Sequence, residues 1–323
     1  MIIVRAPLRI TLGGGGTDVP WYTNQHIGFC ITAAINKYIY ISVHNTFSQE
    51  LTLHYSEHEK CKVLSDITHP IIRAILTDYY QDIAGLEISS MADIPSGTGL
   101  GSSSSFTAAL LQAVHVKLHE PLSRDNLAAT ASRIEMGILR EPIGPQDHYA
   151  TAFGGIRSLN IRGTTVACAS VPISANVATD LEENLVLFFT GYSRSASKLL
   201  QSQSQRTDSA LISNLDATRE LGYRVYDALT NGDVLKFAYM LDKQWILKKD
   251  RQPESVPEDI ERWYIAGKRA GALGGKLIGA GGGGFLMFYS RDKQRLRQTM
   301  KAEGLQELRF RFDWDGVRPV MNS

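Results

Sequence analysis

Residues 95–105 read Pro95-Ser96-Gly97-Thr98-Gly99-Leu100-Gly101-Ser102-Ser103-Ser104-Ser105, and the apolar run Phe106-Thr107-Ala108-Ala109-Leu110-Leu111 follows directly. The proline and the three alternating glycines exclude a regular helix or strand in the first half. The second half predicts a helix with no breaker before Pro121. A glycine-rich loop that leads into a helix leaves backbone N–H groups free beside the positive end of the helix dipole, and such a junction binds phosphate.

The four serines add hydroxyl groups that can donate to phosphate oxygens or coordinate Mg²⁺. A Walker A loop is excluded because no lysine occurs between Asp93 and Val116, and a dinucleotide-binding loop would need glycine where Ser102 stands. A flexible Gly/Ser linker is the remaining alternative, but linkers do not usually run straight into an apolar helix. The stretch therefore favours a phosphate-binding loop.

The composition predicts a soluble globular protein with neither a nucleic acid nor a membrane as partner. Of 323 residues, 43% are hydrophobic and 21% are charged, and 34 Lys+Arg against 33 Asp+Glu leave a net charge of +1. This balance provides no global field for nucleic acid or an anionic membrane, and no run of about 18 apolar residues could span a bilayer. The distant Cys30, Cys61 and Cys168 suit a reducing cytosol, and the first residues lack a signal-peptide pattern.

Strand-like and helix-like segments alternate along the chain, which predicts an α/β architecture. The length suggests two domains, residues 1–175 and 176–323. We expect strands at 2–10 (interrupted at Pro7), 29–43, 50–55, 86–91, 185–190 and 308–312. We expect further helices at 70–80, 124–140, 199–247 (broken near 231–232), 260–273 and 293–303, with a linker at 251–257.

Two more glycine-rich loops follow strand-like segments. Gly13-Gly14-Gly15-Gly16 leads to Thr17 and Asp18, and four glycines let the backbone approach another group closely. A flexible turn with a capping Asp is the alternative for this loop. The other loop, residues 279–284, joins two predicted strands near the end of the chain.

Glu135 lies beside the apolar stripe of the helix that Ser123 is expected to cap. The stripe consists of Leu127, Ala131, Ile134 and Ile138. A carboxylate that points inward from this helix needs a partner or a metal ion, whereas a surface glutamate needs neither.

Asp147 follows Gly144-Pro145-Gln146, which blocks the preceding helix, so Asp147 opens a new element. Loop-to-helix junctions often present a catalytic side chain, although a plain helix cap is the alternative.

Together the three glycine-rich loops resemble the three motifs of the GHMP small-molecule kinases. Residues 6–10 with 15–18 resemble the first motif, residues 95–104 resemble the second, and residues 276–285 resemble the third. The resemblance covers nearly the whole chain in order and spacing. It implies an N-terminal α/β domain with a left-handed βαβ unit, followed by a ferredoxin-like α+β domain, with the site between them.

The resemblance also implies roles for individual residues. Asp147 matches the catalytic aspartate, Arg9 matches a basic residue near it, and Ser103 and Glu135 match the ligands of Mg²⁺. Because residues 102–105 are all serine where many relatives have Ser-Ser-Ala, Ser104 is the alternative metal ligand. The residues expected to bind ATP are Pro95, Gly97, Gly99, Leu100, Gly101, Ser102, Ser103 and Ser104. The residues expected to bind the acceptor are Gly14, Gly15, Gly16, Thr17, Asp18, Arg194, Gly282 and Gly283.

Within this family the chain is most similar to the sugar-1-kinases of the D-glycero-D-manno-heptose phosphate group, because of residues 13–18, 194–196, 245–249 and 275–285. This similarity implies phosphorylation of heptose 7-phosphate at C1 and a role in making nucleotide-activated heptose for surface polysaccharides. The alternatives are another sugar 1-kinase, a homoserine- or mevalonate-type kinase, and a non-catalytic sugar- or ATP-binding regulator. The acidic Asp18 favours polyol substrates over the anionic ones of the mevalonate type. The fucokinase type usually has Trp in its first glycine run, which this chain lacks. The oligomeric state stays open, with a homodimer as one option.

Arg194 is the residue that we expect to bind a phosphate already present on the acceptor. It lies between a predicted strand and a predicted helix, in the segment Gly191-Tyr192-Ser193-Arg194-Ser195-Ala196-Ser197-Lys198. Such a junction again offers free N–H groups to an anion, and a guanidinium group matches phosphate oxygens. An ordinary solvated charge is the alternative for Arg194.

Overall fold

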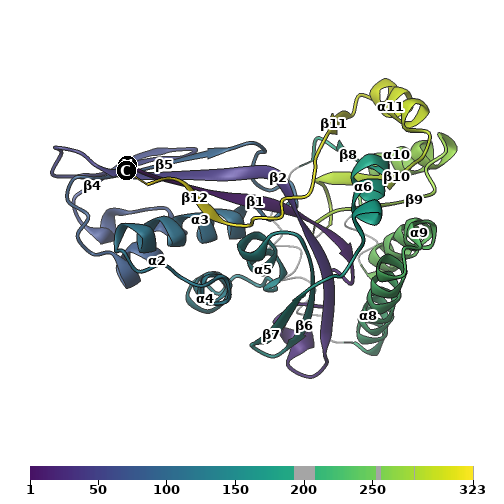
Figure 1. Ribbon diagram of the computed structural model, residues 1–323, viewed down its shortest axis with the longest axis horizontal. Helices are drawn as coiled ribbons and strands as arrows, with labels where there is room; N and C mark the ends of the chain where they lie inside the picture. Colours follow the sequence, from purple (N-terminus) through teal and green to yellow (C-terminus); the bar gives the residue numbers. More distant parts are fainter. Residues whose placement is uncertain (193–207, 252–255, 280, 323) are drawn as a thin grey trace.

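The computed structural model describes residues 1–192, 208–251, 256–279 and 281–322, which form two sheets with helices around them (Figure 1). The first sheet has the strand order β12-β1-β2-β5-β3-β4, and β6 and β7 join it through β2. Its strands are β1 (Ile2–Gly13), β2 (Gly28–Asn45), β3 (Leu51–His54), β4 (His58–Cys61), β5 (Leu86–Ala92), β6 (Ile156–Arg162), β7 (Thr165–Ser170) and β12 (Arg318–Asn322). Only β3 and β5 pair in parallel among the described strands, and α2 (Pro70–Tyr79) lies in the connection between them. This is the expected βαβ unit, whose left hand stays a prediction.

Strand β1 runs without a break through Pro7, so the interruption expected there is wrong. Proline has no N–H group to give to the neighbouring strand, and the pairing of β1 with β2 shifts register between Pro7 and Leu8 instead. The freed carbonyl of Pro7 accepts hydrogen bonds from Ser105 Oγ at 2.8 Å and from Thr151 Oγ1 at 2.7 Å. These bonds attach two helices to the strand that carries Arg9.

Those helices are α3 (Ser102–Lys117) and α5 (Gln146–Phe153), which with α2 and α4 (Arg124–Ser132) cover one face of the first sheet (Figure 1). Ser123 caps α4 as expected, since its side chain accepts a hydrogen bond from the backbone N of Asn126. The helix expected at 124–140 ends earlier, and the π-helical turn η2 (Arg133–Ile138) replaces its second half. Glu135 is buried in this turn, whereas Ile138 is 41% exposed, so its place in the apolar stripe is wrong.

The second sheet contains β8 (Leu185–Phe189), β9 (Gly274–Leu277), β10 (Phe285–Tyr289) and β11 (Gln306–Leu308). Its order, β11-β8-β10-β9, is 4-1-3-2 when the four strands are numbered along the chain, and every pair is antiparallel. Helices separate β8 from β9 and β10 from β11, which is the β-α-β-β-α-β arrangement of a ferredoxin-like domain. The helices between β8 and β9 are α8 (Ser209–Thr230), α9 (Val234–Arg251) and α10 (Glu258–Arg269), and α11 (Lys293–Ala302) precedes β11.

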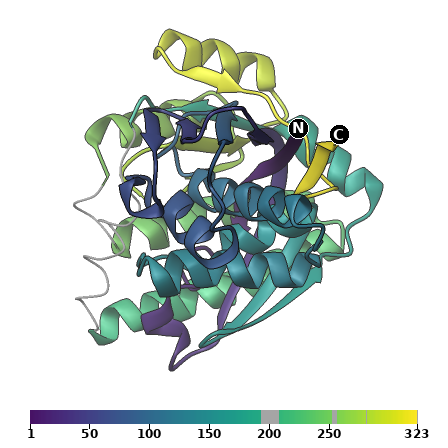
Figure 2. The same ribbon diagram turned by 90° about the vertical axis from the view of Figure 1, so that its left-hand side faces the viewer.

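Two contacts between regular elements help to join the two halves of the chain. Helix α8 packs with α9 and against β1 and β2, and a Cβ on its Gly222 would lie 3.1 Å from the Cα of Gly14 (Figure 1). The strand β12 pairs with β1 although it follows the whole second sheet, and Figure 2 shows it beside the first strand. The boundary expected at residue 175 falls where α6 (Ala175–Asn184) begins, and it stays a prediction.

Two expectations for the second half need correction. The strand expected at 308–312 is wrong, because β11 ends at Leu308 and Phe312 makes only an isolated bridge with Ile35. Arg251, expected to start a linker, is the last residue of α9 and is buried. No helix among the described residues has the length and hydropathy that a membrane span requires.

Candidate active site

All three glycine-rich loops meet around one cavity of about 700 Å³. The first loop contributes Gly15 and Gly16, the second contributes Gly97, Gly99 and Gly101, and the third contributes Gly279, Gly281 and Gly283. The chain thus brings segments from residue 9 to residue 283 to a single site, as their glycine-rich character suggested.

The second loop has the geometry of an anion site. Its glycines Gly97, Gly99 and Gly101 have φ values of 75°, 80° and 80°, in the left-handed region that side chains rarely adopt. Gly101 is the N-cap of α3 and no described side chain caps this helix. The N–H groups of the first turn, at Ser102, Ser103 and Ser104, therefore stay available to a ligand.

Gly99 also brings the two halves of the site into contact. A Cβ on Gly99 would lie 2.9 Å from the Cα of Gly279 and 3.0 Å from the carbonyl oxygen of Ile278. Only a glycine fits between the second and third loops at this point. Substitution there would separate the phosphate loop from the third glycine-rich loop.

Arg9 and Asp147, which both line the cavity, form a bidentate ion pair. Arg9 Nε donates to Asp147 Oδ1 and Arg9 Nη2 donates to Asp147 Oδ2, both at 2.6 Å. Arg9 Nη1 donates to the carbonyl of Gly99 at 2.5 Å, and Arg9 is 6% exposed. The guanidinium group therefore fixes the carboxylate plane and links it to the phosphate loop.

Asp18 lies beside this pair and is 3% exposed. Burial raises the pKa of the Asp18 carboxyl above its ordinary value, and the negative charge of Asp147 raises it further. A Cβ on Gly144 would lie 2.1 Å from Asp18 Oδ2, so the carboxyl occupies the space that a side chain would otherwise fill. Asp18 and Asp147 are thus two neighbouring carboxyl groups in one cavity.

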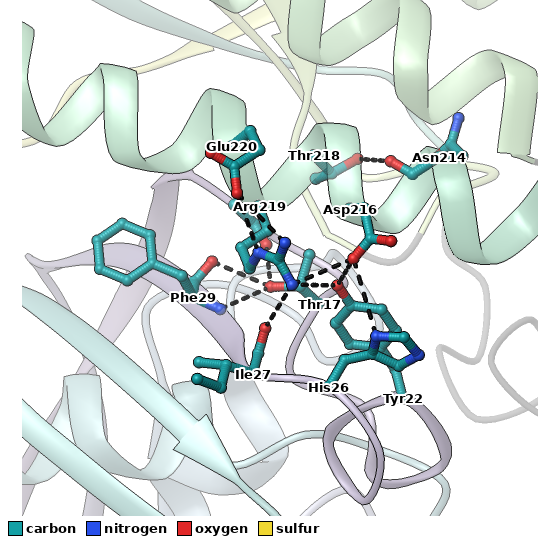
Figure 3. Close-up of polar contacts among 11 residues, drawn as sticks. Thr17, Tyr22, His26, Ile27, Phe29, Asn214, Asp216, Thr218, Arg219 and Glu220 are labelled. Carbon is teal, nitrogen blue, oxygen red and sulfur yellow. Dashed lines mark hydrogen bonds and ion pairs between the residues drawn. The ribbon is translucent and has the colours of Figure 1, made fainter.

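The loop that carries Asp18 is held by hydrogen bonds at both of its ends, as Figure 3 shows in part. Thr17 Oγ1 donates to the carbonyl of Gly14 at 2.9 Å and accepts from the N of Phe29 at 3.0 Å. Tyr22 Oη donates to Asp216 of α8 at 2.7 Å, and Arg219 Nη1 reaches the same Tyr22 Oη at 3.2 Å (Figure 3). Helix α8 therefore positions the loop from the second half of the chain.

Glu135 lies at the centre of a buried hydrogen-bond network. Ser103 Oγ donates to Glu135 Oε2 at 2.6 Å, and Thr107 Oγ1 donates to Oε1 at 2.7 Å. His148 Nε2 lies 3.0 Å from the same Oε1. Burial alone would raise the pKa of Glu135, but His148 and the two hydroxyls outweigh it and lower that pKa, so the carboxylate is ionised.

The pair of Ser103 and Glu135 fits a magnesium site. Both side chains line the cavity and present two oxygen atoms 2.6 Å apart, and Mg²⁺ prefers oxygen ligands supplemented by substrate phosphates and water. Ser104 also lines the cavity, but the contact with Glu135 is made by Ser103.

Most of the expected binding residues line the cavity, and five do not. Pro95, Leu100, Gly14, Thr17 and Gly282 lie outside its lining. Two of these have a supporting role, because Leu100 O accepts from the N of Arg9 at 2.9 Å and Thr17 holds the first loop. Arg194 lies outside the described residues, and its role stays a prediction.

Several polar residues that line the cavity were not assigned to the site from the sequence, and they include Gln244, Lys248, Arg251 and Lys276. The first three stand at i, i+4 and i+7 of α9, a spacing that places them on one helix face. His148 was missed as well, since nothing in the sequence links it to Glu135. The spacing of Gln244, Lys248 and Arg251 could have indicated a polar helix face. It was overlooked because Arg251 was predicted to begin a linker and not to end a helix.

The arrangement suits transfer of a phosphoryl group to a hydroxyl. Such a reaction needs positioning and neutralisation of negative charge more than covalent help. The N-terminus of α3 can hold phosphate oxygens, and Asp147 can accept the proton of an attacking hydroxyl, since each carboxylate oxygen keeps a further lone pair beside Arg9.

The chain matches two family profiles, GHMP kinases N terminal domain over residues 67–155 and GHMP kinases C terminal over residues 225–305. Together the two segments cover more than half of the chain. The D-glycero-alpha-D-manno-heptose 7-phosphate kinase of Campylobacter jejuni is 29% identical, with 98% of each chain covered. The bifunctional fucokinase/GDP-fucose pyrophosphorylase of Arabidopsis thaliana is 25% identical over 96% of this chain and 32% of its own length.

Among solved structures, a D-glycero-D-manno-heptose 1-phosphate kinase from Bacteroides thetaiotaomicron superposes with a TM-score of 0.83 at 25% identity, covering 100% of both chains. This likeness extends over both sheets and all three loops. Because both halves of the family's fold are matched, in order and along one chain, this protein belongs to the GHMP kinases.

Proposed function

We propose that this protein transfers the γ-phosphoryl group of ATP to the anomeric hydroxyl of D-glycero-D-manno-heptose 7-phosphate, forming the 1,7-bisphosphate and ADP. The observation that carries the proposal is the Arg9–Asp147 pair, which stands beside Asp18 in the cavity that the phosphate loop enters. The full-length similarity to a heptose 7-phosphate kinase supports this choice of acceptor.

In the proposed reaction the anomeric oxygen attacks the γ-phosphorus, the bond from that phosphorus to the β–γ bridging oxygen breaks, and ADP leaves. Asp147 accepts the proton of the hydroxyl, and Arg9 holds the carboxylate in place. Asp18 accepts hydrogen bonds from neighbouring ring hydroxyls and so turns C1 toward Asp147. The N-terminus of α3 holds the phosphates of ATP.

Magnesium completes this proposal. Ser103 and Glu135 would hold Mg²⁺ through their oxygen atoms, and the ion would offset the negative charge that develops on the phosphates. His148 and Thr107 keep the Glu135 carboxylate oriented, since both contact its Oε1.

The names of the two heptose kinases refer to sugars that carry their phosphate at different carbons, C7 for the Campylobacter protein and C1 for the Bacteroides protein. The decisive experiment therefore measures ADP formation with heptose 7-phosphate, heptose 1-phosphate and unphosphorylated heptose. Phosphorus–proton NMR of the product then identifies the phosphorylated carbon. We expect turnover of the 7-phosphate and coupling to the C1 proton; coupling to another position would refute the proposal.

A fucose, galactose or mannose 1-kinase is the second candidate, because Asp18 would grip ring hydroxyls of any of these sugars. The similarity to a fucokinase supports that candidate, although it reaches only a third of that protein's length. The same assay with these three sugars separates the candidates. An absence of ADP with every sugar would favour a binding protein without catalysis.

A further inference from the structure

A group of buried cations forms one wall of the cavity, on the side of the loop that carries Asp18. Arg251 is 6% exposed and lines the cavity. A Cβ on Gly16 would lie 3.0 Å from Arg251 Nη2, so the guanidinium group lies directly on this loop. Arg251 Nη2 reaches the carbonyl of Gly15 at 3.5 Å, whereas the buried Nη1 has no hydrogen-bond partner among the described residues.

Two lysines extend this wall. Lys276 is 6% exposed, and its Nζ donates to Gln244 Oε1 at 2.7 Å. Lys248 stands one helical turn before Arg251, and its Nζ donates to the carbonyls of Leu277 and Gly279. All three side chains line the same cavity.

No carboxylate among the described residues forms an ion pair with Arg251, Lys248 or Lys276, in contrast to their neighbours. Lys249, on the same helix, pairs with Glu261 at 2.8 Å and does not line the cavity. Neutral carbonyl and amide oxygens are the partners of the three wall cations. The wall therefore contains basic groups that no carboxylate in the described part of the chain contacts, and among those carboxylates only the charge of Asp18 acts on Arg251 from a distance.

Such charge is costly to bury unless an anion compensates it. The cost is visible in the groups themselves, since burial lowers the pKa of Arg251 to about 10 and that of Lys276 to about 7. A ligand that brings negative charge to the wall would recover this free energy on binding. A guanidinium group with a free Nη1 is suited to phosphate oxygens.

Two anions could occupy the wall, namely a phosphate of ATP or a phosphate of the acceptor. The N-terminus of α3 provides for the ATP phosphates, and it belongs to the second loop. Arg251 instead contacts Gly15 and Gly16, which stand three and two residues before Asp18. The position of Arg251 favours the acceptor.

We infer that Arg251, assisted by Lys248 and Lys276, binds the phosphate group that the acceptor carries before the reaction. This inference rests on the proposed function, because it assumes a phosphorylated sugar as acceptor. It assigns selection of the phosphorylated sugar to the C-terminal end of α9. It does not depend on Arg194.

The test compares the wild type with Arg251→Gln and Arg251→Lys at saturating ATP and Mg²⁺. For heptose 7-phosphate, we expect Arg251→Gln to raise KM about 10- to 100-fold, because hydrogen bonds between charged groups are lost. We expect KM for unphosphorylated heptose and KM for ATP to change less than about threefold. Arg251→Lys keeps the charge without the planar fork and should recover part of the affinity.

Lys249→Gln is the matched control, since it removes one positive charge from the same helix outside the cavity; it should leave all three constants unchanged. Calorimetric titration of heptose 7-phosphate without ATP gives a readout independent of turnover, and Arg251→Gln should weaken that binding by the same factor. If Arg251→Gln does not fold, Lys276→Met tests the same wall by removing another basic group, and the same rise in KM for heptose 7-phosphate is expected.

Each contrary outcome has a distinct meaning. If Arg251→Gln and Lys276→Met leave the preference for heptose 7-phosphate over heptose unchanged, the inference is wrong while the proposed function stands. If KM for ATP rises instead, the wall serves the nucleotide, which also overturns the inference. If the wild type shows no preference for the phosphorylated sugar, the proposed acceptor itself is wrong.

Discussion

Replacement of Asp147 by Asn tests the chemical centre of the site with a minimal change of shape. The amide keeps an oxygen for Arg9 Nε, but its NH₂ group would face the N–H donors of Arg9 Nη2, which now bond to Oδ2 at 2.6 Å. The variant thus loses the proton acceptor and half of the bidentate contact. General-base catalysis contributes about 10²–10⁴-fold, so we expect kcat to fall about 10³-fold, equivalent to about 4 kcal/mol in the activation free energy.

Steady-state ADP release measures this effect, with heptose 7-phosphate and ATP varied separately. We expect KM for ATP to change less than about threefold, because Asp147 contributes no N–H group to the phosphate loop. Asp78→Asn is a suitable control, since it breaks an exposed ion pair with Arg133 at 3.1 Å and should leave kcat unchanged. A correctly folded Asp147→Asn variant with kcat within about tenfold of the wild type would refute the role of Asp147 as proton acceptor.

Three further predictions concern the other carboxyl groups and the cation wall. Glu135→Gln should raise the Mg²⁺ concentration for half-maximal activity about tenfold or more, and an unchanged Mg²⁺ titration would place Glu135 outside the metal site. Burial raises the pKa of Asp18 in the folded protein above the ordinary Asp pKa of 3.8, which applies to the unfolded chain. As the pH rises above 3.8, ionisation of Asp18 therefore favours the unfolded state and lowers the stability of the fold. Asp18→Asn should therefore have a higher free energy of unfolding than the wild type at pH 8 but not near pH 4, and its sugar binding should be weaker. Urea unfolding at the two pH values measures the difference in stability, and an equal difference at both would contradict the prediction. Burial lowers the pKa of Lys276 to about 7, so a bound phosphate at pH 8 should cause Lys276 to take up a proton. Calorimetry in buffers of different ionisation enthalpy measures this proton uptake, and its absence on binding of heptose 7-phosphate would mean that Lys276 stays neutral.

Local sequence signals were sufficient to locate the loops and several side chains of the site. The three glycine-rich loops could be recognised because positive φ values at Gly97, Gly99 and Gly101 require glycine at those positions. The place of Glu135 beside an apolar helix stripe indicated that it could point inward, but a surface position stayed open until the structure showed it buried. The Gly-Pro break before α5 placed Asp147 at the start of a helix, whereas its place in the site came from the resemblance to the family.

Contacts between distant segments could not be read from local patterns. Arg9 and Asp147 are 138 residues apart, and only the resemblance to a family placed them together. Arg251 looked like a linker residue because Pro253 follows closely, a signal that often ends a helix but does not say which way its last side chain points. The strands β6, β7 and β12 were missed, since short strands with exposed faces lack a strong alternation of apolar residues.

The position of β12 has a consequence for the order in which the protein is assembled. Residues 318–322 pair with the first strand, whereas residues 185–308 form the second sheet between them in the sequence. During synthesis the ribosome releases β1 more than 300 residues before its outer partner. The outer edge of β1 thus lacks its final partner until the second half has been made, and unpaired edges invite association with other chains. Completion of the first sheet is in this sense the last step of folding. Substitutions that slow formation of the second sheet should therefore increase aggregation through the exposed edge of β1, although they lie far from that edge.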